Sequence, residues 1–342
     1  MNVKFVEKFL TQNGFEKYRA AQIREMVYKN FAGSFEEMTV LPLELRNLLK
    51  TNFALLSFRP ERIIASKDSN ALKAAFCLKD GAIIESVLMS SPGNKWNACL
   101  STQVGCPLNC SFCATGRMGF KRNLSAEEIT DQVLFWNQYL RPSRISNLVF
   151  MGMGEPFLNY DAVKEALDII ISPDFFGMGQ RHVSVSTAGH IPGILRFAKD
   201  FPEANLAISL NACSDEIRDE IMPINRKYPM KYLSQAVSEY LDLTGRKIFI
   251  EYVLLKGVND GGRDANLLSE WIKKTGAVKL FNVNLIAYNR TSENFTAPSP
   301  GKIMRFKFAL EKSGIPVTLR KSFGPDINAA CGQLGVSLGL PR

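Results

Sequence analysis

Hydrophobic and polar positions along the chain follow two rhythms, and the change between them falls near residue 96. Before it, apolar residues recur near helical spacing, as at Ile23 and Val27, and this pattern predicts helices over residues 1–75. A β-rich stretch with an Asp-Gly turn then covers residues 76–95. We therefore expect a small helical accessory domain, a connecting β segment and a larger domain after them.

From residue 96 onward, short apolar runs alternate with amphipathic stretches. Six runs have strand character: "WNACLS", "SNLVFMG", "HVSVST", "NLAISL", "KIFIEYVLL" and "NVNLIAY". The helical stretch "SAEEITDQVLFWNQYL" opens with Ser125 and Glu128 in capping-box spacing. Strands that alternate with helices form parallel βα units, so we expect an α/β fold over residues 96–300. The pattern favours a partial (βα)6 barrel, with a doubly wound sheet as the alternative. Residues 301–342 add a helix, one strand and a glycine-rich loop.

Composition narrows the classes of function. The 342 residues are 46% hydrophobic and 22% charged, which predicts a packed core rather than disorder. No apolar run reaches the roughly 18 residues of a membrane span, and the start "MNVKFVEKFLTQNG" lacks a signal-peptide core. We therefore expect a cytoplasmic protein without a membrane partner. The net charge of +9 is consistent with a polyanionic partner such as nucleic acid. Only two histidines, His182 and His190, are present, which nearly excludes a histidine cluster.

Three of the seven cysteines, Cys106, Cys110 and Cys113, lie within the stretch "CPLNCSFC". In a reducing compartment, clustered cysteines bind metal or act in catalysis more often than they form disulfides. A structural zinc site needs four ligands, and here the fourth would have to be a distant cysteine. An iron–sulfur cluster held by only three thiolates would keep one iron open to a small molecule. The motif therefore indicates a catalytic cluster, with a zinc knuckle or buried free thiols as the alternative.

Polar and glycine residues follow the ends of the later strands. Because a βα barrel builds its active site from the loops at the carboxyl ends of its strands, we expect these residues to share one site with the cysteines. In chain order they are Gly154, Glu155, Ser186, Ser209, Leu210, Asn211 and Asn289.

The spacing C-x3-C-x2-C, with Phe112 before the last cysteine, resembles the signature of radical S-adenosylmethionine (SAM) enzymes. Over nearly its whole length the chain resembles the RlmN/Cfr family of radical SAM RNA adenine methyltransferases. Matching segments include "YRAAQI", "VGCPLNCSFCATG", "FMGMGEP", "MPIN", "EYVLLKGVND" and "DINAACGQL". The resemblance implies a TIM-like partial radical SAM barrel, one [4Fe-4S] cluster per chain on the three cysteines, and two SAM molecules per turnover. It assigns the SAM contacts to the strand-end residues named above. Position 211, usually histidine in the family, is asparagine here.

The resemblance also implies roles for Cys99, Cys331 and Glu85. Cys331 would accept a methyl group from one SAM and become S-methylcysteine. A radical from a second SAM would abstract hydrogen from that methyl, and the carbon radical would add to the adenine ring. Glu85 would accept the ring proton, and attack by Cys99 would release methylated RNA with a Cys99–Cys331 disulfide. From the residues alone, Cys99 is a buried strand thiol, Cys331 belongs to a loop, and Glu85 is an exposed strand residue.

The activity implied is methylation of adenine C2 in 23S rRNA, at the peptidyl transferase centre, and of an anticodon-adjacent adenine in tRNAs. Pro156 in "GMGEP" resembles this branch, whereas the C8-methylating antibiotic-resistance branch commonly has alanine there. A non-catalytic Fe–S or zinc RNA-binding protein is the alternative of another class. An electron donor such as flavodoxin or ferredoxin and a monomeric state complete the expectation. The cations expected to contact RNA are Arg19, Arg24, Lys29, Arg46, Lys50, Lys121, Arg122, Arg320 and Lys321.

Overall fold

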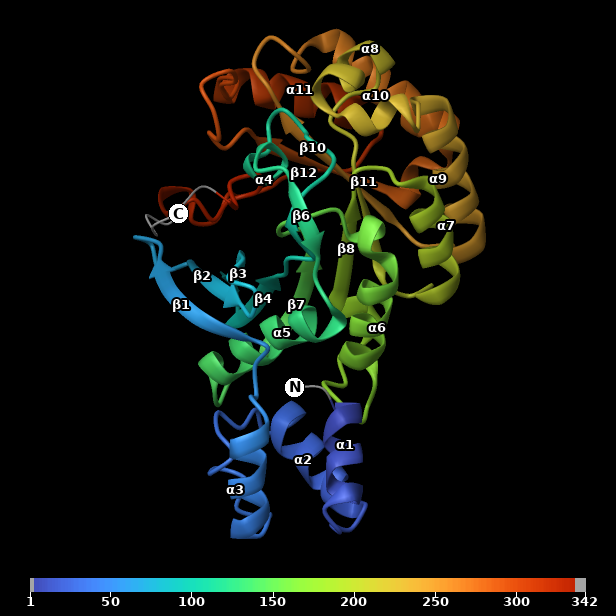
Figure 1. Cartoon of the computed structure of the whole chain (residues 1–342). Helices are drawn as coiled ribbons and strands as arrows, with labels where there is room; N and C mark the ends of the chain where they lie inside the picture. Colours follow the sequence, from blue (N-terminus) through green and yellow to red (C-terminus); the bar gives the residue numbers. More distant parts are fainter. Residues whose placement is uncertain (1–2, 336–342) are drawn as a thin grey trace.

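The strands of one large sheet follow each other in chain order (Figure 1). In the computed structural model, which describes residues 3–335, three consecutive antiparallel strand pairs lead into a run of parallel strands. The strands, in order across the sheet, are β1 (Phe58–Ala65), β2 (Ala71–Leu78), β3 (Ile83–Ser91), β4 (Lys95–Cys99), β7 (Ile145–Phe150), β8 (Val183–Thr187), β9 (Asn205–Ser209), β10 (Ile248–Leu254), β11 (Phe281–Ala287) and β12 (Val317–Leu319). A separate antiparallel pair consists of β5 (Gln103–Gly105) and β6 (Phe120–Asn123).

From β4 to β12 every neighbouring pair of strands is parallel, and helices cover the outer face of the curved sheet (Figure 1). This order confirms the partial barrel. A doubly wound sheet would reverse its strand order at a switch point, and this sheet does not. Within the described residues, β1 and β12 are its two edges. The helices of this part are α4 (Ala114–Arg117), α5 (Ala126–Leu140), α6 (Tyr160–Ile171), α7 (Ile191–Asp200), α8 (Asp215–Ile221), α9 (Met230–Thr244), α10 (Gly262–Thr275) and α11 (Pro300–Lys312).

Helix α5 shows how local sequence fixes an element that supports the site. The Ser125 hydroxyl accepts a hydrogen bond from Glu128 N at 3.1 Å, and the Glu128 carboxylate accepts one from Ser125 N at 2.9 Å, so the expected capping box is present. The helix buries Ile129, Val133 and Trp136 in the core. The Trp136 indole donates to the hydroxyl of Ser86 on β3, which joins the helix to the first part of the sheet.

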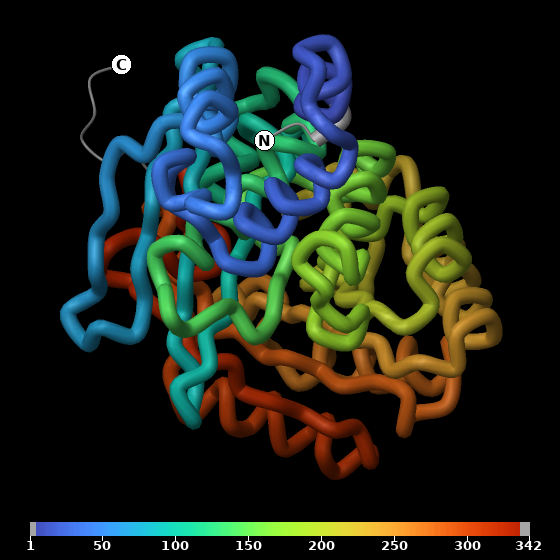
Figure 2. Tube along the Cα trace, turned by 90° about the horizontal axis from the view of Figure 1, so that it is seen from below, coloured from blue at the N-terminus to red at the C-terminus, as the bar shows by residue number. Residues whose placement is uncertain are grey.

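The N-terminal helices end earlier than the pattern predicts. They are α1 (Val3–Gln12), α2 (Tyr18–Tyr28) and α3 (Leu43–Asn52), and they gather at one end of the molecule (Figures 1 and 2). Helical structure was expected over residues 1–75, but residues 58–65 and 71–78 are strands. These residues are strands and not helices because β2 pairs with β1 on one side and with β3 on the other. Residues 76–95 are therefore part of the main sheet and not a separate connector.

The C-terminal part contains the expected helix, strand and loop. After β12, residues 320–335 return toward the hairpin strands β2 and β3 and pass close to α4 (Figure 1). This segment, which carries Cys331, closes the space between the hairpin and the barrel. The glycine-rich end of the sequence, residues 336–342, lies outside the described residues. Among the described helices, none combines the length and apolar character needed to cross a membrane.

Candidate active site

Two adjoining cavities lie inside the partial barrel. The first, here the motif cavity, has a volume of about 170 Å³ and lies at the carboxyl ends of the strands. The second, here the Cys99 cavity, has a volume of about 390 Å³ and lies beside β4 and β7. Cys113 and Cys331 line both of them. The expected residues that line the motif cavity are Cys106, Cys110, Cys113, Gly154, Glu155, Ser186, Ser209, Asn211, Asn289 and Cys331.

The three motif cysteines surround one end of the motif cavity. The turn that starts their loop requires glycine, because Gly105 has φ +76° and a Cβ there would lie 1.8 Å from the carbonyl oxygen of Gly119. All three thiols are free, and burial raises the pKa of Cys106 to about 12. Burial also raises the pKa of Cys110 well above its ordinary value. Such thiols become thiolates when a metal replaces the proton.

The three motif thiols all line the motif cavity, which is compatible with a cluster held by three protein ligands. Within residues 3–335, no three histidine, cysteine or acidic side chains converge closely enough to hold one metal ion. In an iron–sulfur cluster each thiolate binds a different iron, so three cysteines can hold one cluster. The donor set and its position at the end of the motif cavity therefore fit a cluster with three protein ligands.

Gly154 and Glu155 form a close-packed turn after β7. Gly154 has φ +104°, and a Cβ there would lie 2.6 Å from Cβ of Gln103. The Glu155 amide donates to Oε1 of Gln103 at 2.8 Å, and the Glu155 carboxylate accepts hydrogen bonds from Ala188 N at 2.8 Å and Phe157 N at 3.2 Å. Burial raises the pKa of Glu155 to about 7 in spite of these bonds. A cationic group in the motif cavity would find a buried, hydrogen-bonded carboxylate here.

We expect Glu155→Gln to flatten the pH dependence of stability of the metal-free protein. The Glu155 carboxyl ionises near pH 7 in the folded chain and near 4.5 as a free group, so its contribution is complete below pH 4.5 and is lost as the pH rises to about 7. The difference corresponds to about 3 kcal/mol. Urea unfolding at pH 5 and pH 7.5 measures it. The exposed Glu239→Gln is the control, and an identical pH dependence in the Glu155→Gln variant would contradict the assignment.

The remaining strand-end residues lie as a barrel predicts, with one exception. The hydroxyls of Ser186 on β8 and Ser209 on β9 are 3.3 Å apart. Asn289, after β11, donates to the carbonyl oxygen of Cys331 at 3.2 Å. Leu210 does not line the motif cavity, since its side chain is fully buried in the core. Only its backbone faces toward the loops, and its carbonyl accepts from Arg218 at 3.0 Å.

Asn211 shows why the usual histidine can be replaced. Its backbone has φ +60°, a region where Asn, Asp and His are the side chains best tolerated after glycine. Its Oδ1 accepts from Val253 N at 2.8 Å, and its carbonyl accepts from Nδ2 of Asn259 at 2.7 Å. Asn211 therefore joins the β9 and β10 loops through its own amide while still lining the motif cavity.

Arg218 is a structural element of the site that the sequence did not point to. Its side chain is fully buried, and its three donor nitrogens bond the carbonyls of Leu210 and Ala188 and the Oδ1 of Asn225 at 2.7–3.0 Å. Burial lowers the pKa of Arg218 to about 10. The residue ties together the loops after β8 and β9, and its partner Asn225 belongs to the quoted segment "MPIN". This segment was the one feature of the sequence that could have pointed to Arg218.

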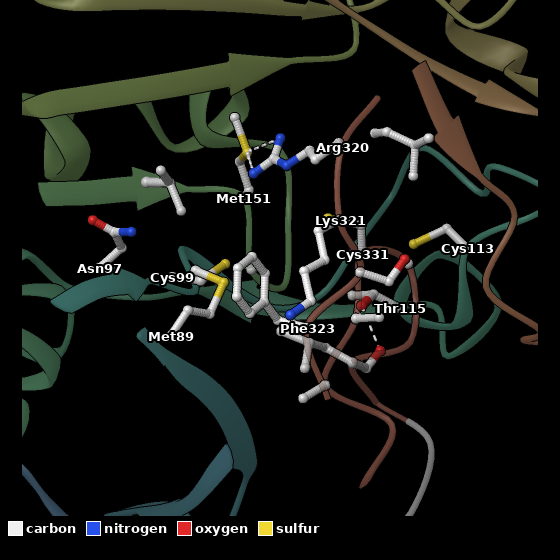
Figure 3. A pocket seen from close by; sticks show the side chains of 18 of the residues that line it. Met89, Asn97, Cys99, Cys113, Thr115, Met151, Arg320, Lys321, Phe323 and Cys331 are labelled. Atoms are coloured by element: carbon white, nitrogen blue, oxygen red, sulfur yellow. Dashed lines mark hydrogen bonds between the residues drawn. The ribbon is translucent and has the colours of Figure 1, made fainter. Parts of the chain in front are cut away.

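Cys99 and Cys331 line the same cavity although 232 positions separate them in the sequence. Figure 3 shows Cys99 and Cys113 toward opposite sides of the view, with Cys331 between them. Both thiols are free; Cys99 is buried and Cys331 is exposed. Burial and the neighbouring Cys331 raise the pKa of Cys99 to about 12, while the Arg320 guanidinium acts in the opposite direction. Burial is the larger of these effects.

The nine cations expected at an RNA surface differ in pairing and exposure. Arg19 and Arg46 are half-buried and donate to Gln22 and to the carbonyl oxygen of Glu36. Arg24, Lys50 and Arg122 are held in ion pairs with carboxylates. Arg320 is not a surface cation, since it lines both cavities and donates to Glu251 at 2.9 Å. The cations that remain exposed, with no carboxylate partner among the described residues, are Lys29, Lys121 and Lys321.

Glu85 is buried and not exposed, contrary to the interpretation from the residues alone. Its carboxylate lies 3.0 Å from the ammonium of Lys73 and accepts a hydrogen bond from Gly335 N. It does not line either of the two cavities. Glu85 was expected to accept the proton of the adenine ring, and in this position its carboxylate does not face either cavity.

Comparisons with known proteins cover nearly the whole chain. Residues 1–55 match the family described as the ribosomal RNA large subunit methyltransferase N-terminal domain, and residues 100–267 match the radical SAM superfamily. A probable dual-specificity RNA methyltransferase RlmN of Pseudothermotoga lettingae is 43% identical over 336 residues, covering 97% of this chain and 95% of the relative. The corresponding protein of Geobacillus kaustophilus is 42% identical, covering 96% of this chain and 89% of the relative.

A solved structure of a radical SAM methyltransferase has a very similar fold over nearly the whole chain. The crystal structure of a radical SAM methyltransferase from Sphaerobacter thermophilus superimposes with a TM-score of 0.93 at 40% identity, and 98% of each chain is covered. The agreement extends from the N-terminal helices through the barrel to the C-terminal part.

Proposed function

This chain belongs to the RlmN family of radical SAM RNA methyltransferases, and on that premise we propose that it methylates C2 of an adenine. The substrates proposed are the peptidyl transferase region of 23S rRNA and an anticodon-adjacent adenine in tRNAs. A monomer that receives electrons from a flavodoxin- or ferredoxin-type donor would carry out the reaction. The relatives' description as dual-specificity RNA methyltransferases supports the choice of two RNA classes.

One observation carries this proposal: Cys331 lines both the motif cavity and the Cys99 cavity. A thiol in this position can receive a group on the side of the three motif cysteines and present it on the side of Cys99. Neither a zinc knuckle nor a non-catalytic RNA-binding protein has use for a thiol shared by two cavities. This placement therefore supports a carrier role for Cys331.

The residues that would hold the cofactors are the three motif cysteines, for a [4Fe-4S] cluster, and the Glu155 turn with its neighbours, for SAM. When bound, the cluster and SAM would supply the one-electron chemistry that a ring carbon without nucleophilic character requires. Cys331 would become S-methylcysteine, and two SAM molecules would be used per turnover. Gly154 and Asn211 would keep backbone atoms close to the ligand, while Ser186, Ser209 and Asn289 would donate or accept hydrogen bonds around it.

The later part of the reaction would depend on Cys99 and Glu85. After the methylene on Cys331 has joined the adenine ring, the adduct would lose its unpaired electron to the oxidised cluster and the proton of the ring carbon to Glu85. Cys99 would then form a sulfur–sulfur bond with Cys331 while the carbon–sulfur bond to the RNA breaks. The electron pair of that bond would leave with the base and take up the proton lost by the Cys99 thiol, which completes the methyl group.

The C8-methylating branch is the second candidate, and Pro156 is the residue that argues against it. Pro156 is the first residue of a short 3-10 helix and is buried beside the Glu155 turn. Proline at this place fixes the backbone that follows Glu155. The difference from alanine is confined to one residue, so the product itself must decide.

The test is the identity of the methylated nucleoside. Anaerobically reconstituted protein, protein-free ribosomal RNA and methyl-labelled SAM are incubated with a reductant, and the RNA is digested and analysed by mass spectrometry against standards. We expect labelled 2-methyladenosine. Labelled 8-methyladenosine would place the chain in the other branch, and absence of both products and of 5′-deoxyadenosine would overturn the proposal of a radical SAM activity.

A further inference from the structure

A buried ion pair lies behind the segment that carries Cys331. Lys73 on β2 and Glu85 on β3 have side chains only 1% and 4% exposed, and their charged atoms are 3.0 Å apart. Because Ala75 is opposite Glu85 and Lys73 is opposite Val87, the two are diagonal neighbours on one face of the sheet. Lysine is almost never fully buried unless it is paired, so this pair calls for an explanation.

The remaining hydrogen bonds of this pair go to the C-terminal segment, residues 324–335. The Lys73 ammonium donates to the carbonyl oxygen of Asn328 at 3.1 Å, and the Glu85 carboxylate accepts from the amide of Gly335 at 2.6 Å. Asn328 and Gly335 lie on either side of Cys331 in the sequence. The ion pair therefore holds the Cys331 segment at two points that bracket the thiol.

The opposite side of the same segment is attached to the barrel. The carbonyl oxygen of Gly332 accepts from Ala114 N at 2.8 Å, and that of Leu334 accepts from the Thr115 hydroxyl at 2.7 Å. Ala114 and Thr115 directly follow the last motif cysteine. The segment around Cys331 is thus hydrogen-bonded to the hairpin strands on one side and to the residues after the cysteine motif on the other.

The segment has little regular structure that could hold its shape by itself. Apart from one short 3-10 turn (Pro325–Ile327), it contains no helix or strand. Four of its residues have left-handed backbones: Gly324, Asn328, Gly332 and Gly335. Successive left-handed turns interrupt regular hydrogen bonding, so the position of Cys331 depends on the attachments at the segment's two sides.

We propose that Lys73 is a positioning residue for Cys331: with Glu85 it anchors the C-terminal segment to the β2–β3 hairpin and so places the thiol between the two cavities. This inference rests on the proposed function, in which Cys331 carries a group from one cavity to the other. It also gives Glu85 a second task. One oxygen of Glu85 meets the Lys73 ammonium and the other accepts from the Gly335 amide, so Glu85 also takes part in holding this segment.

The experiment compares Lys73→Met with the wild-type full-length protein by hydrogen–deuterium exchange. We expect amide exchange in residues 324–335 to rise roughly tenfold, because Asn328 loses its donor and Glu85 loses its ionic partner. Lys302→Met is the matched control, since it removes another lysine–carboxylate pair, Lys302 with Asp260 at 2.6 Å, away from this segment. RNA methylation is measured in parallel, with a fall in kcat at unchanged KM for RNA expected in Lys73→Met alone.

Exchange within twofold of wild type in residues 324–335 of Lys73→Met would overturn the proposal, and so would an equal rise in strand β10 or in the Lys302→Met control. If Lys73→Met does not fold, Glu85→Gln provides the same exchange test, because it removes the other charge and keeps the side-chain size. Exchange does not depend on activity. A loosened segment in a protein that makes no methyladenosine would therefore defeat the proposed function and leave the anchoring role intact.

Discussion

Replacing Cys99 with alanine should leave the protein covalently attached to its RNA. In the reaction proposed, only attack by the Cys99 thiol breaks the bond between Cys331 and the methylated base. The variant should therefore carry the base as a stable adduct, and release of methylated RNA should fall by at least about a hundredfold. Labelled RNA that migrates with the protein in a denaturing gel, and is removed by nuclease, measures the adduct.

Two cysteine variants make this result specific. Cys331→Ala removes the carrier, so neither adduct nor methylated RNA should form. Cys77→Ala makes the same chemical change at a partly buried thiol on β2 that lines neither cavity, and should behave as wild type. Wild-type release of product by Cys99→Ala would show that another group resolves the adduct.

Gly154→Ala should destabilise the protein and weaken SAM binding at the proposed SAM site. A Cβ at this position would lie 2.6 Å from Cβ of Gln103 and 2.9 Å from its backbone nitrogen, and φ +104° is itself unfavourable for alanine. Displacing Gln103 would also break its bond to the Glu155 amide. We expect a loss of about 3 kcal/mol in the free energy of unfolding and at least a tenfold weaker SAM affinity.

Gly257→Ala is the matched control for this prediction. Gly257 also has a left-handed backbone, with φ +76°, but a Cβ there meets nothing within 4 Å. This variant should lose only about 1 kcal/mol and bind SAM normally. Urea unfolding and calorimetric titration of SAM measure the two quantities. Equal losses in both variants would mean that backbone conformation alone, and not the contact with Gln103, determines the effect.

The barrel and the composition of its site could be predicted because both rest on local patterns. Six apolar runs alternate with amphipathic stretches, and the ends of parallel strands meet at one edge, so Ser186, Ser209 and Asn289 were expected near the cysteines. The roles expected for Cys99, Cys331 and Glu85 came from family resemblance. The sequence around each of these residues contains no motif that would indicate a catalytic role.

The wrong predictions have a common physical cause: contacts between residues that are far apart in the sequence determine the structure at these positions. Residues 58–65 were assigned to helix because "FRPERIIA" is an edge strand in which only Phe58 is buried, so it shows no alternation. Glu85 was interpreted as exposed because the strands and the C-terminal segment that cover it are not visible locally. Arg218 was missed for a similar reason: its three acceptors belong to three separate segments of the chain.

The attachments of the Cys331 segment also determine an order of assembly. Lys73 meets Asn328 across 255 positions, and Gly335 meets Glu85 across 250, whereas each barrel strand pairs with the strand that follows it along the sheet. Contacts that close such long loops carry the largest entropic cost and form late in folding. A folding intermediate would then have its motif cysteines and the strand-end loops in place before the segment with Cys331 docks. Cofactor capture and the capacity to transfer a methyl group would thus be acquired as separate events, with the second completing the native state.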